Sequence, residues 1–171
     1  MIVIQTTIDR RAMTALARVS RKTLRRGRSM PVRTLAWFVV VLEAFLTVSY
    51  LRGGFGSWLP NTLMGLFMLG CLLLEDRVNG AVSLRQIEAD SRVVNAVFQE
   101  DSCYVHRTQA GESWWAYSQI KLAAETRDYF VLLTDRARGQ VYDKRGFTWG
   151  DAGQLRALLQ SKTGLKIQQM R

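Results

Sequence analysis

The chain has 171 residues and a formal net charge of +10, and this charge is unevenly distributed. Residues 1–33 hold nine basic side chains and one acidic side chain, whereas residues 34–171 hold 15 basic and 13 acidic side chains. A nucleic-acid-binding protein needs a positive face on a folded domain, so the nearly balanced C-terminal part predicts no nucleic-acid partner. The two cysteines, Cys71 and Cys103, and the single histidine, His106, show no metal-ligand spacing, and neither a disulfide framework, a metal site nor a cofactor is expected.

The N-terminal segment, residues 1–33, combines a short strand with a basic helix. Apolar and polar side chains alternate over residues 1–7, which predicts the strand. Thr7 or Asp9 then caps an amphipathic helix of about 18 residues, which Gly27 and Pro31 are expected to end. Such a helix lies naturally on a membrane surface, where basic side chains attract anionic headgroups. The side chains expected at that surface are Arg18, Lys22, Arg25 and Arg26.

Two apolar runs follow, residues 34–51 and residues 59–74. At about 1.5 Å per residue the first covers roughly 27 Å, close to a hydrocarbon core of about 30 Å. Only seven residues join the runs, which favours an antiparallel transmembrane hairpin over residues 34–74. A pair of buried core helices or a re-entrant hairpin is the alternative. Because the basic cluster precedes the first run, the turn is expected outside and both termini in the cytoplasm.

Glu43 lies near the middle of the first run, where an ionised carboxylate costs at least a few kcal/mol. If Leu51 lies level with Leu59, Glu43 faces the depth of Phe67, and the hairpin offers no cationic residue at that level. Two interpretations stay open. Glu43 either has a functional role, as a proton- or cation-handling site in an oligomer or as a contact with a partner subunit, or is a neutral acid that hydrogen-bonds a backbone carbonyl.

The part of the chain after the hairpin predicts one cytosolic β-rich domain. Residues 75–91 are expected to form a connector helix, and from residue 92 the apolar period changes to two. Short strands alternate with turn sequences, which predicts an antiparallel meander with residues 1–7 as an added edge strand. Asp151 then caps a final helix with a leucine stripe, and Gly164 ends it. The expected strands cover residues 93–99, 102–108, 113–117, 119–125, 129–134 and 139–144, and the domain covers residues 92–171.

Two features of this domain suggest a binding face. Trp114 and Trp115 are adjacent, so one of them points out of a strand and could anchor a partner or the membrane interface. Charged residues also gather at the ends of two predicted strands, and these are Glu125, Asp128, Lys144 and Arg145. The alternative for the tryptophans is core packing, with Trp114 under a loop. The alternative for the charges is a solvated loop face with weak surface pairs.

Several stretches resemble the YcxB-like family of small bacterial membrane proteins. They are residues 117–121 (YSQIK), 125–133 (ETRDYFVLL), 143–147 (DKRGF) and 155–164. The last of these contains the pattern Leu-Leu-x-x-Lys-Thr-Gly. The layout of strand, amphipathic segment, two apolar runs and tail is similar as well. One departure is Asp143, where the family often shows proline. The resemblance implies a cytosolic domain akin to bacterial pleckstrin-homology-like folds at the inner membrane, and no established activity.

The sequence therefore predicts an α+β membrane protein, with a two-helix transmembrane hairpin and a small cytosolic antiparallel sheet closed by a C-terminal helix. No catalytic motif stands out, so the chain is not expected to be an enzyme. The leading function is a membrane-tethered interaction or sensing module at the inner leaflet. Its expected partners are anionic lipid headgroups and a protein or a second copy. The alternative is a small oligomeric transporter or channel subunit that uses Glu43.

Overall fold

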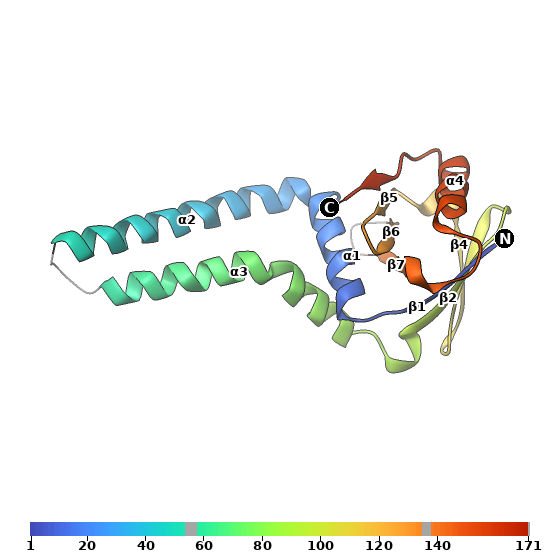
Figure 1. Cartoon of the computed structure of the whole chain (residues 1–171), viewed down its shortest axis with the longest axis horizontal. Helices are drawn as coiled ribbons and strands as arrows, with labels where there is room; N and C mark the ends of the chain where they lie inside the picture. Colours follow the sequence, from blue (N-terminus) through green and yellow to red (C-terminus); the bar gives the residue numbers. More distant parts are fainter. Residues whose placement is uncertain (54–57, 135–137, 171) are drawn as a thin grey trace. The chain divides into compact units, whose positions relative to one another are not determined.

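The computed structural model describes residues 1–53, 58–134 and 138–170. The chain forms two units, which we describe separately. Residues 1–24 and 77–171 form the first, here called the α+β unit, and residues 25–76 form the second, the hairpin unit (Figure 1). The predicted α+β class is confirmed by helices and two sheets in the described part of the chain.

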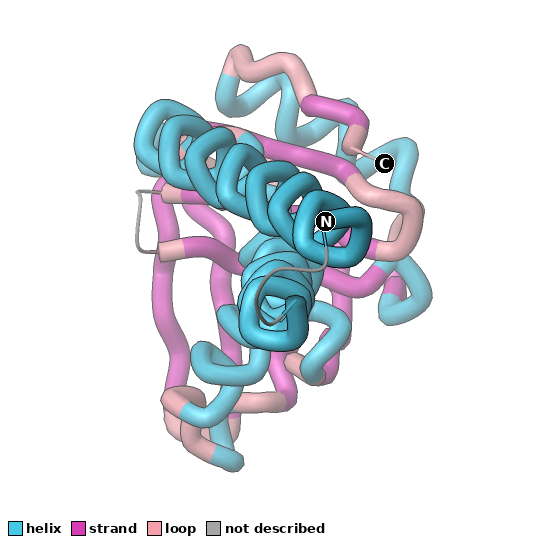
Figure 2. Tube along the Cα trace, turned by 90° about the vertical axis from the view of Figure 1, so that its left-hand side faces the viewer, coloured by secondary structure: helices cyan, strands magenta, loops and turns pink. Residues whose placement is uncertain are grey.

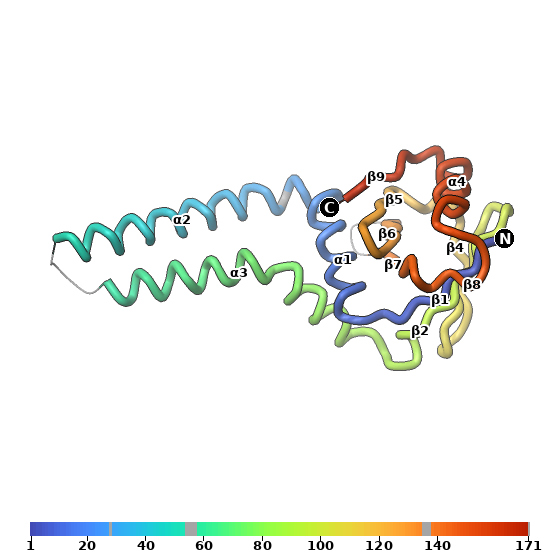
Figure 3. The backbone as a smooth tube through the Cα atoms, viewed as in Figure 1, coloured from blue at the N-terminus to red at the C-terminus, as the bar shows by residue number. Residues whose placement is uncertain are grey.

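The first sheet has β1 in its interior, although the sequence predicted an edge strand there. The strand order is β4-β3-β2-β1-β8, and every pairing is antiparallel. β1 gains a second neighbour because a short strand, β8, pairs with it from far along the chain (Figure 3). The strands are β1 (Ile2–Thr7), β2 (Val93–Phe98), β3 (Cys103–Thr108), β4 (Gly111–Ala116) and β8 (Phe147–Trp149).

The second sheet has the order β7-β6-β5-β9, in which β9 pairs with β5 in parallel. Its strands are β5 (Leu122–Glu125), β6 (Tyr129–Leu133), β7 (Gly139–Asp143) and β9 (Gln168–Gln169). The single predicted meander is thus divided between two sheets. The division falls at a 3-10 turn, η2 (Tyr117–Gln119), where Tyr117 is buried and its hydroxyl donates to the Gln99 carbonyl at 2.9 Å.

The two sheets meet where β1 passes the end of β7. The Asp143 amide donates to the Thr6 hydroxyl at 3.0 Å, and Gly146 lies so close to the Gln5 carbonyl that no Cβ would fit. Between the sheets lies the main core, with Tyr104 and Tyr142 among its largest buried side chains. This junction holds the turn after β7 in a fixed place beside β1.

The final helix, α4 (Ala152–Thr163), forms as predicted. The Asp151 side chain accepts from the Gln154 amide at 2.8 Å, and Gly164 ends the helix in the left-handed conformation at φ +66°. Leu155 and Leu159 are fully buried in the main core, so α4 closes it.

The first helix, α1 (Arg10–Lys22), packs on protein rather than lipid. Of the two predicted caps, Thr7 and Asp9, it is Asp9 that caps the helix, by accepting from the Ala12 amide at 2.7 Å. Ala12 and Val19 are fully buried and pack in one cluster with Val131 of β6 and Val141 of β7. The apolar face that the sequence assigned to a membrane surface is therefore covered by the second sheet, and only the basic face of α1 stays open.

The hairpin unit contains two helices long and apolar enough to cross a membrane. α2 (Arg26–Gly53) begins before Pro31, so the break between α1 and α2 lies at residues 23–25 and not at the predicted Gly27 and Pro31. Pro31 removes only one backbone donor in the second turn, and the helix continues. α3 (Trp58–Arg85) runs through most of the predicted connector and is followed by the 3-10 turn η1 (Ala89–Ser91).

The two helices of this unit run side by side and antiparallel (Figure 1; Figure 2 views them nearly end-on). Arg33 forms an ion pair with Glu75, and the hydroxyls of Thr47 and Thr62 lie 3.3 Å apart. A Cβ on Gly65 would lie 3.2 Å from the Cβ of Glu43. The register therefore differs by only two residues from the predicted pairing of Glu43 with Phe67.

Candidate anion-binding site

A cavity of about 470 Å³ opens in the α+β unit with arginines on all its walls. One wall is α1, the second is the end of α3, and the third is formed by the β5–β6 turn and the 3-10 turn η3 (Lys144–Gly146). We call it the arginine cavity. The arginines that line it are Arg10, Arg11, Arg18, Arg77, Arg127 and Arg145.

The α1 wall follows directly from the periodicity of that helix. Arg10, Thr14 and Arg18 recur every four residues and share one face with Arg11. The opposite face is buried against the second sheet. Burial of one face therefore fixes the direction in which the three arginines project.

Arg77 is held beside α1 by a close contact between two helices. Gly80 lies one turn further along α3, and a Cβ there would lie 2.7 Å from the Thr14 amide nitrogen. Only glycine permits this approach, because any Cβ would meet the backbone of α1. Arg77 and Gly80 share a helix face at this spacing, so Arg77 is presented to the same cavity as Arg10.

The third wall is built from hydrogen-bonded turns. The Thr126 hydroxyl accepts from the Tyr129 amide at 3.0 Å and donates to the Tyr129 carbonyl at 3.1 Å, which shapes the β5–β6 turn. The Lys144 amide donates to the Asp128 carbonyl at 2.9 Å and joins this turn to η3. Arg127 and Arg145 project from these two turns into the cavity lining.

Positive charge dominates the arginine cavity. Two aspartates are the acidic residues of its lining, and both already have partners: Asp143 accepts from the Arg145 amide at 2.9 Å, and Asp128 lies 3.5 Å from the Arg145 guanidinium. Four guanidinium groups have no hydrogen bond or ion pair to any residue that the structure describes, and they belong to Arg10, Arg11, Arg77 and Arg127. Burial and the nearby carboxylates raise the pKa of Tyr129, so its phenol stays a neutral donor in the lining. The arrangement can bind an anion.

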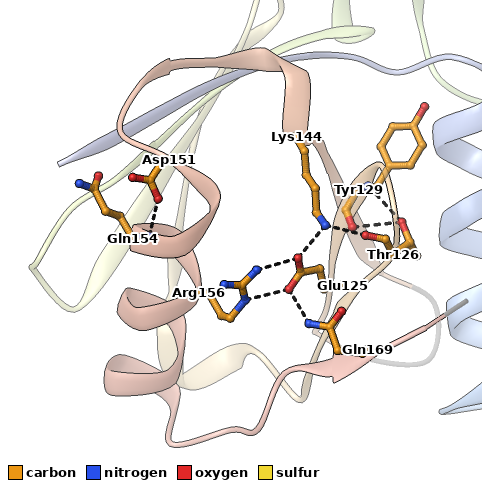
Figure 4. Close-up of polar contacts among 8 residues, drawn as sticks. All are labelled: Glu125, Thr126, Tyr129, Lys144, Asp151, Gln154, Arg156 and Gln169. Carbon is orange, nitrogen blue, oxygen red and sulfur yellow. Dashed lines mark hydrogen bonds and ion pairs between the residues drawn. The ribbon is translucent and has the colours of Figure 1, made fainter.

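Glu125 lies at the centre of a separate, buried cluster (Figure 4). Its carboxylate is only 4% exposed and accepts two hydrogen bonds from Arg156, both at 2.9 Å. Lys144 and Gln169 donate to the same carboxylate at 2.6 and 2.7 Å. Hydrogen bonds from Arg156 above all, opposed by burial, hold the pKa of Glu125 at about 2. The cluster joins β5, β9, α4 and η3, and its role is to hold these elements together.

The structure separates the residues of the predicted binding face. Asp128 and Arg145 line the arginine cavity, whereas Glu125 and Lys144 belong to the buried cluster. Trp114 stands 64% exposed on β4, in the other sheet, while Trp115 packs against the main core.

The predicted membrane-surface residues are also divided. Arg18 lines the arginine cavity, and Lys22 ends α1. Arg25 and Arg26 belong to the hairpin unit. Sequence reasoning missed the cavity itself because its walls come from three distant segments. The one local signal was the four-residue spacing of Arg10, Thr14 and Arg18.

Glu43 keeps an unsatisfied atom in the hairpin unit. Its Oε2 atom is buried and has no hydrogen-bond partner among the residues described, and Gly65 faces it from α3. A carboxyl oxygen without a partner inside a helix pair is costly unless the group is protonated or meets a further donor. The hydrogen bond to a backbone carbonyl that the second interpretation expects is not formed by Oε2 among the described residues.

A second cavity of the α+β unit, about 760 Å³, is lined by residues of α1, α3 and both sheets, among them His106, Trp115 and Gln140. The Nδ1 atom of His106 is buried without a partner among the described residues, and burial lowers the pKa of this side chain. No group of three histidine, cysteine or acidic side chains that could hold a metal ion occurs in the described part of the chain. Comparisons of the chain with protein-family models, with curated proteins and with solved structures give no match.

Proposed function

We propose that this chain is a membrane-tethered binding module of the bacterial cytoplasmic membrane. The hairpin unit crosses the bilayer twice, and the α+β unit binds an anionic ligand at the inner leaflet. The observation that carries the proposal is the arginine cavity, in which four guanidinium groups have no partner among the described residues. An arginine cluster of this kind attracts anions from solution and from a charged surface.

The tether is supported by the exposure of the two apolar helices. None of the apolar window of α2 and only 6% of that of α3 is buried. Large side chains such as Phe45, Leu63 and Phe67 are exposed by more than half. Soluble proteins rarely leave such continuous apolar surface in water, and a bilayer is the solvent that covers it.

The topology is supported by strand pairing in addition to charge. β1 precedes the hairpin in the sequence and β2 follows it, yet the two strands pair along their whole length, from Ile2 with Phe98 to Thr7 with Val93. Both ends of the hairpin must then emerge on the same side of the bilayer, as two crossings require. The basic cluster before α2 favours the cytoplasm as that side.

A pleckstrin-homology-like fold and membership in the YcxB-like family belong to the same proposal. One antiparallel and one mixed sheet, closed by a C-terminal helix, are the features that support them. The proposed function does not depend on either, since it rests on the arginine cavity and the apolar hairpin.

The test is a topology map of the full chain in a bacterial host. Reporters fused at residue 1 and residue 171 are expected to read cytoplasmic, and a tag at Gly54 is expected to read external. Gly54 lies outside the described residues, so it serves only as a marker of the predicted turn. Extraction with carbonate should leave the chain in the membrane fraction. A C-terminus outside the cytoplasm, or release by carbonate, would contradict the proposal.

A second candidate function, a small oligomeric transporter or channel subunit, is favoured by one observation. The Oε2 atom of Glu43 is buried in the helix pair without a hydrogen-bond partner among the described residues, and ionisable groups in such places commonly serve proton or ion pathways. Measurement of proton or cation flux in proteoliposomes separates this function from the first.

A further inference from the structure

We infer that the arginine cavity is a phosphate-binding site, whose ligand is the phosphate group of a phospholipid headgroup or of a soluble phosphate compound. The inference rests on the proposed function and makes its ligand specific.

The number and direction of the guanidinium groups favour phosphate over carboxylate. Arg10 and Arg11 reach the cavity from α1, Arg77 from α3 and Arg127 from the β5–β6 turn. A carboxylate has two oxygens in one plane, and one or two arginines are enough to satisfy it. A phosphate group presents three or four oxygens in a tetrahedron, so it can accept hydrogen bonds from several walls at once.

Packing and hydrogen bonds within the α+β unit hold the walls in place without a ligand. Gly80 fixes α3 against the backbone of Thr14, and the buried face of α1 fixes that helix on the second sheet. The Thr126 hydroxyl and the Lys144 amide hold the two turns of the third wall. A preorganised site loses less conformational entropy on binding, which raises affinity for a small ligand.

The charge of the lining favours an anion with more than one negative charge. Six arginines face two aspartates in the lining, and both aspartates already have partners. Tyr129 adds a neutral phenol donor, because burial raises its pKa. The cavity volume of about 470 Å³ lies within the range of about 300–1,000 Å³ typical of small-ligand sites.

The sequence position of Arg77 supports a phospholipid headgroup as one source of the phosphate group. Arg77 follows Leu74, the last residue of the second apolar run, by three residues of the same helix. At about 1.5 Å per residue this is roughly 5 Å of helix. A residue so close to the end of a membrane-spanning run lies at the depth of the headgroups.

The experiment measures binding to the purified full-length chain in a neutral detergent. Isothermal titration uses four probes: inorganic phosphate, dihexanoyl phosphatidic acid, dihexanoyl phosphatidylcholine and acetate. The cavity variant is Arg10→Gln with Arg127→Gln, which removes one guanidinium from each of two different walls. The control variant is Arg85→Gln with Arg92→Gln, which removes the same charge from exposed positions outside the arginine cavity.

We expect phosphate and phosphatidic acid to bind the native chain more tightly than acetate. The cavity variant should weaken both by about tenfold or more, since two charge-assisted contacts are lost. The control variant should change them by less than about twofold, as expected for screened surface charges. Phosphatidic acid that binds at least about tenfold tighter than inorganic phosphate identifies the lipid as the source, and equal affinities identify a soluble compound. Circular dichroism checks that both variants fold.

Three outcomes would overturn the inference. They are acetate binding as tight as phosphate, equal losses in the cavity and control variants, and no binding of either phosphate probe. These failures are distinguishable from failure of the membrane tether, because the topology map does not depend on the cavity. If the topology map agrees with the prediction but no phosphate probe binds, the membrane tether is supported and the phosphate-binding site is contradicted.

Discussion

Gly80 of α3 and Thr14 of α1 approach so closely that a Cβ on residue 80 would lie 2.7 Å from the Thr14 nitrogen and 2.9 Å from its Cα. The contact is backbone against backbone, so a side chain at residue 80 cannot be accommodated by a change of rotamer. The end of α3 therefore has one position relative to α1 within the α+β unit.

Gly80→Ala should destabilise the α+β unit by about 1–3 kcal/mol, because the added methyl forces two packed helices apart. The melting temperature of the full chain in detergent, followed by circular dichroism, should fall by several degrees. Affinity for inorganic phosphate should fall too, since Arg77 moves with α3. Gly70→Ala is the matched control, because a Cβ at Gly70 has no neighbour within 4 Å. Equal melting temperatures for the two variants would show that the close contact between Gly80 and Thr14 does not contribute to stability.

Glu125→Ala should destabilise the α+β unit by about 1.5–3 kcal/mol, because it removes a buried, hydrogen-bonded carboxylate. The change leaves Arg156 and Lys144 without the buried carboxylate that now pairs with both. Glu112→Ala is the comparison, because Glu112 forms an ion pair with Arg107 in which both side chains are about half exposed. That variant should lose less than about 1 kcal/mol. Thermal unfolding measures both, and similar losses would show that the buried cluster contributes no more than a surface pair.

The same carboxylate predicts a pH dependence of stability. The pKa of Glu125 is lowered from 4.5 to about 2 in the folded chain, so the folded state binds this proton more weakly than the unfolded state. The contribution of the Glu125 carboxylate to folding stability is therefore fully present above its pKa in the unfolded chain. It is lost as the pH falls toward 2. The difference in melting temperature between the native chain and Glu125→Gln should shrink between about pH 6 and about pH 2.5. A difference that stays constant over this range would contradict the assignment.

Glu43→Gln separates the two candidate functions. The substitution keeps the volume of the side chain and its capacity for hydrogen bonds, but removes its ionisable group. If the chain is a tethered binding module, the variant should insert, fold and bind phosphate as the native chain does. Proton or cation flux in proteoliposomes that is present in the native chain and absent in Glu43→Gln would instead support the transporter function.

Local features of the fold are predictable from the sequence because their causes are local. Asp9 and Asp151 cap helices through hydrogen bonds to residues three positions away, and Gly164 supplies a left-handed conformation that few other residues adopt. The register of α2 against α3 is predicted to within two residues, since a short turn leaves little freedom.

Long-range features are not accessible in the same way. β8 and β9 have only three and two residues, too few to show an alternating pattern. The arginine cavity depends on the approach of Gly80 to Thr14 and on two turns of the second sheet, and no spacing in the sequence encodes that meeting. The basic face of α1 is visible in the sequence, whereas the surface that covers its apolar face is not.

The interior place of β1 sets the order in which the protein assembles. Residues 2–7 are synthesised before the hairpin, but their partners in β2 and β8 are synthesised only after the whole hairpin. At about 5–20 residues per second, β1 waits on the order of ten seconds for β2 and longer for β8. The two apolar helices are complete in this interval and can enter the bilayer first. The first sheet can close only after β8 has been synthesised, so folding of the α+β unit follows synthesis of the hairpin.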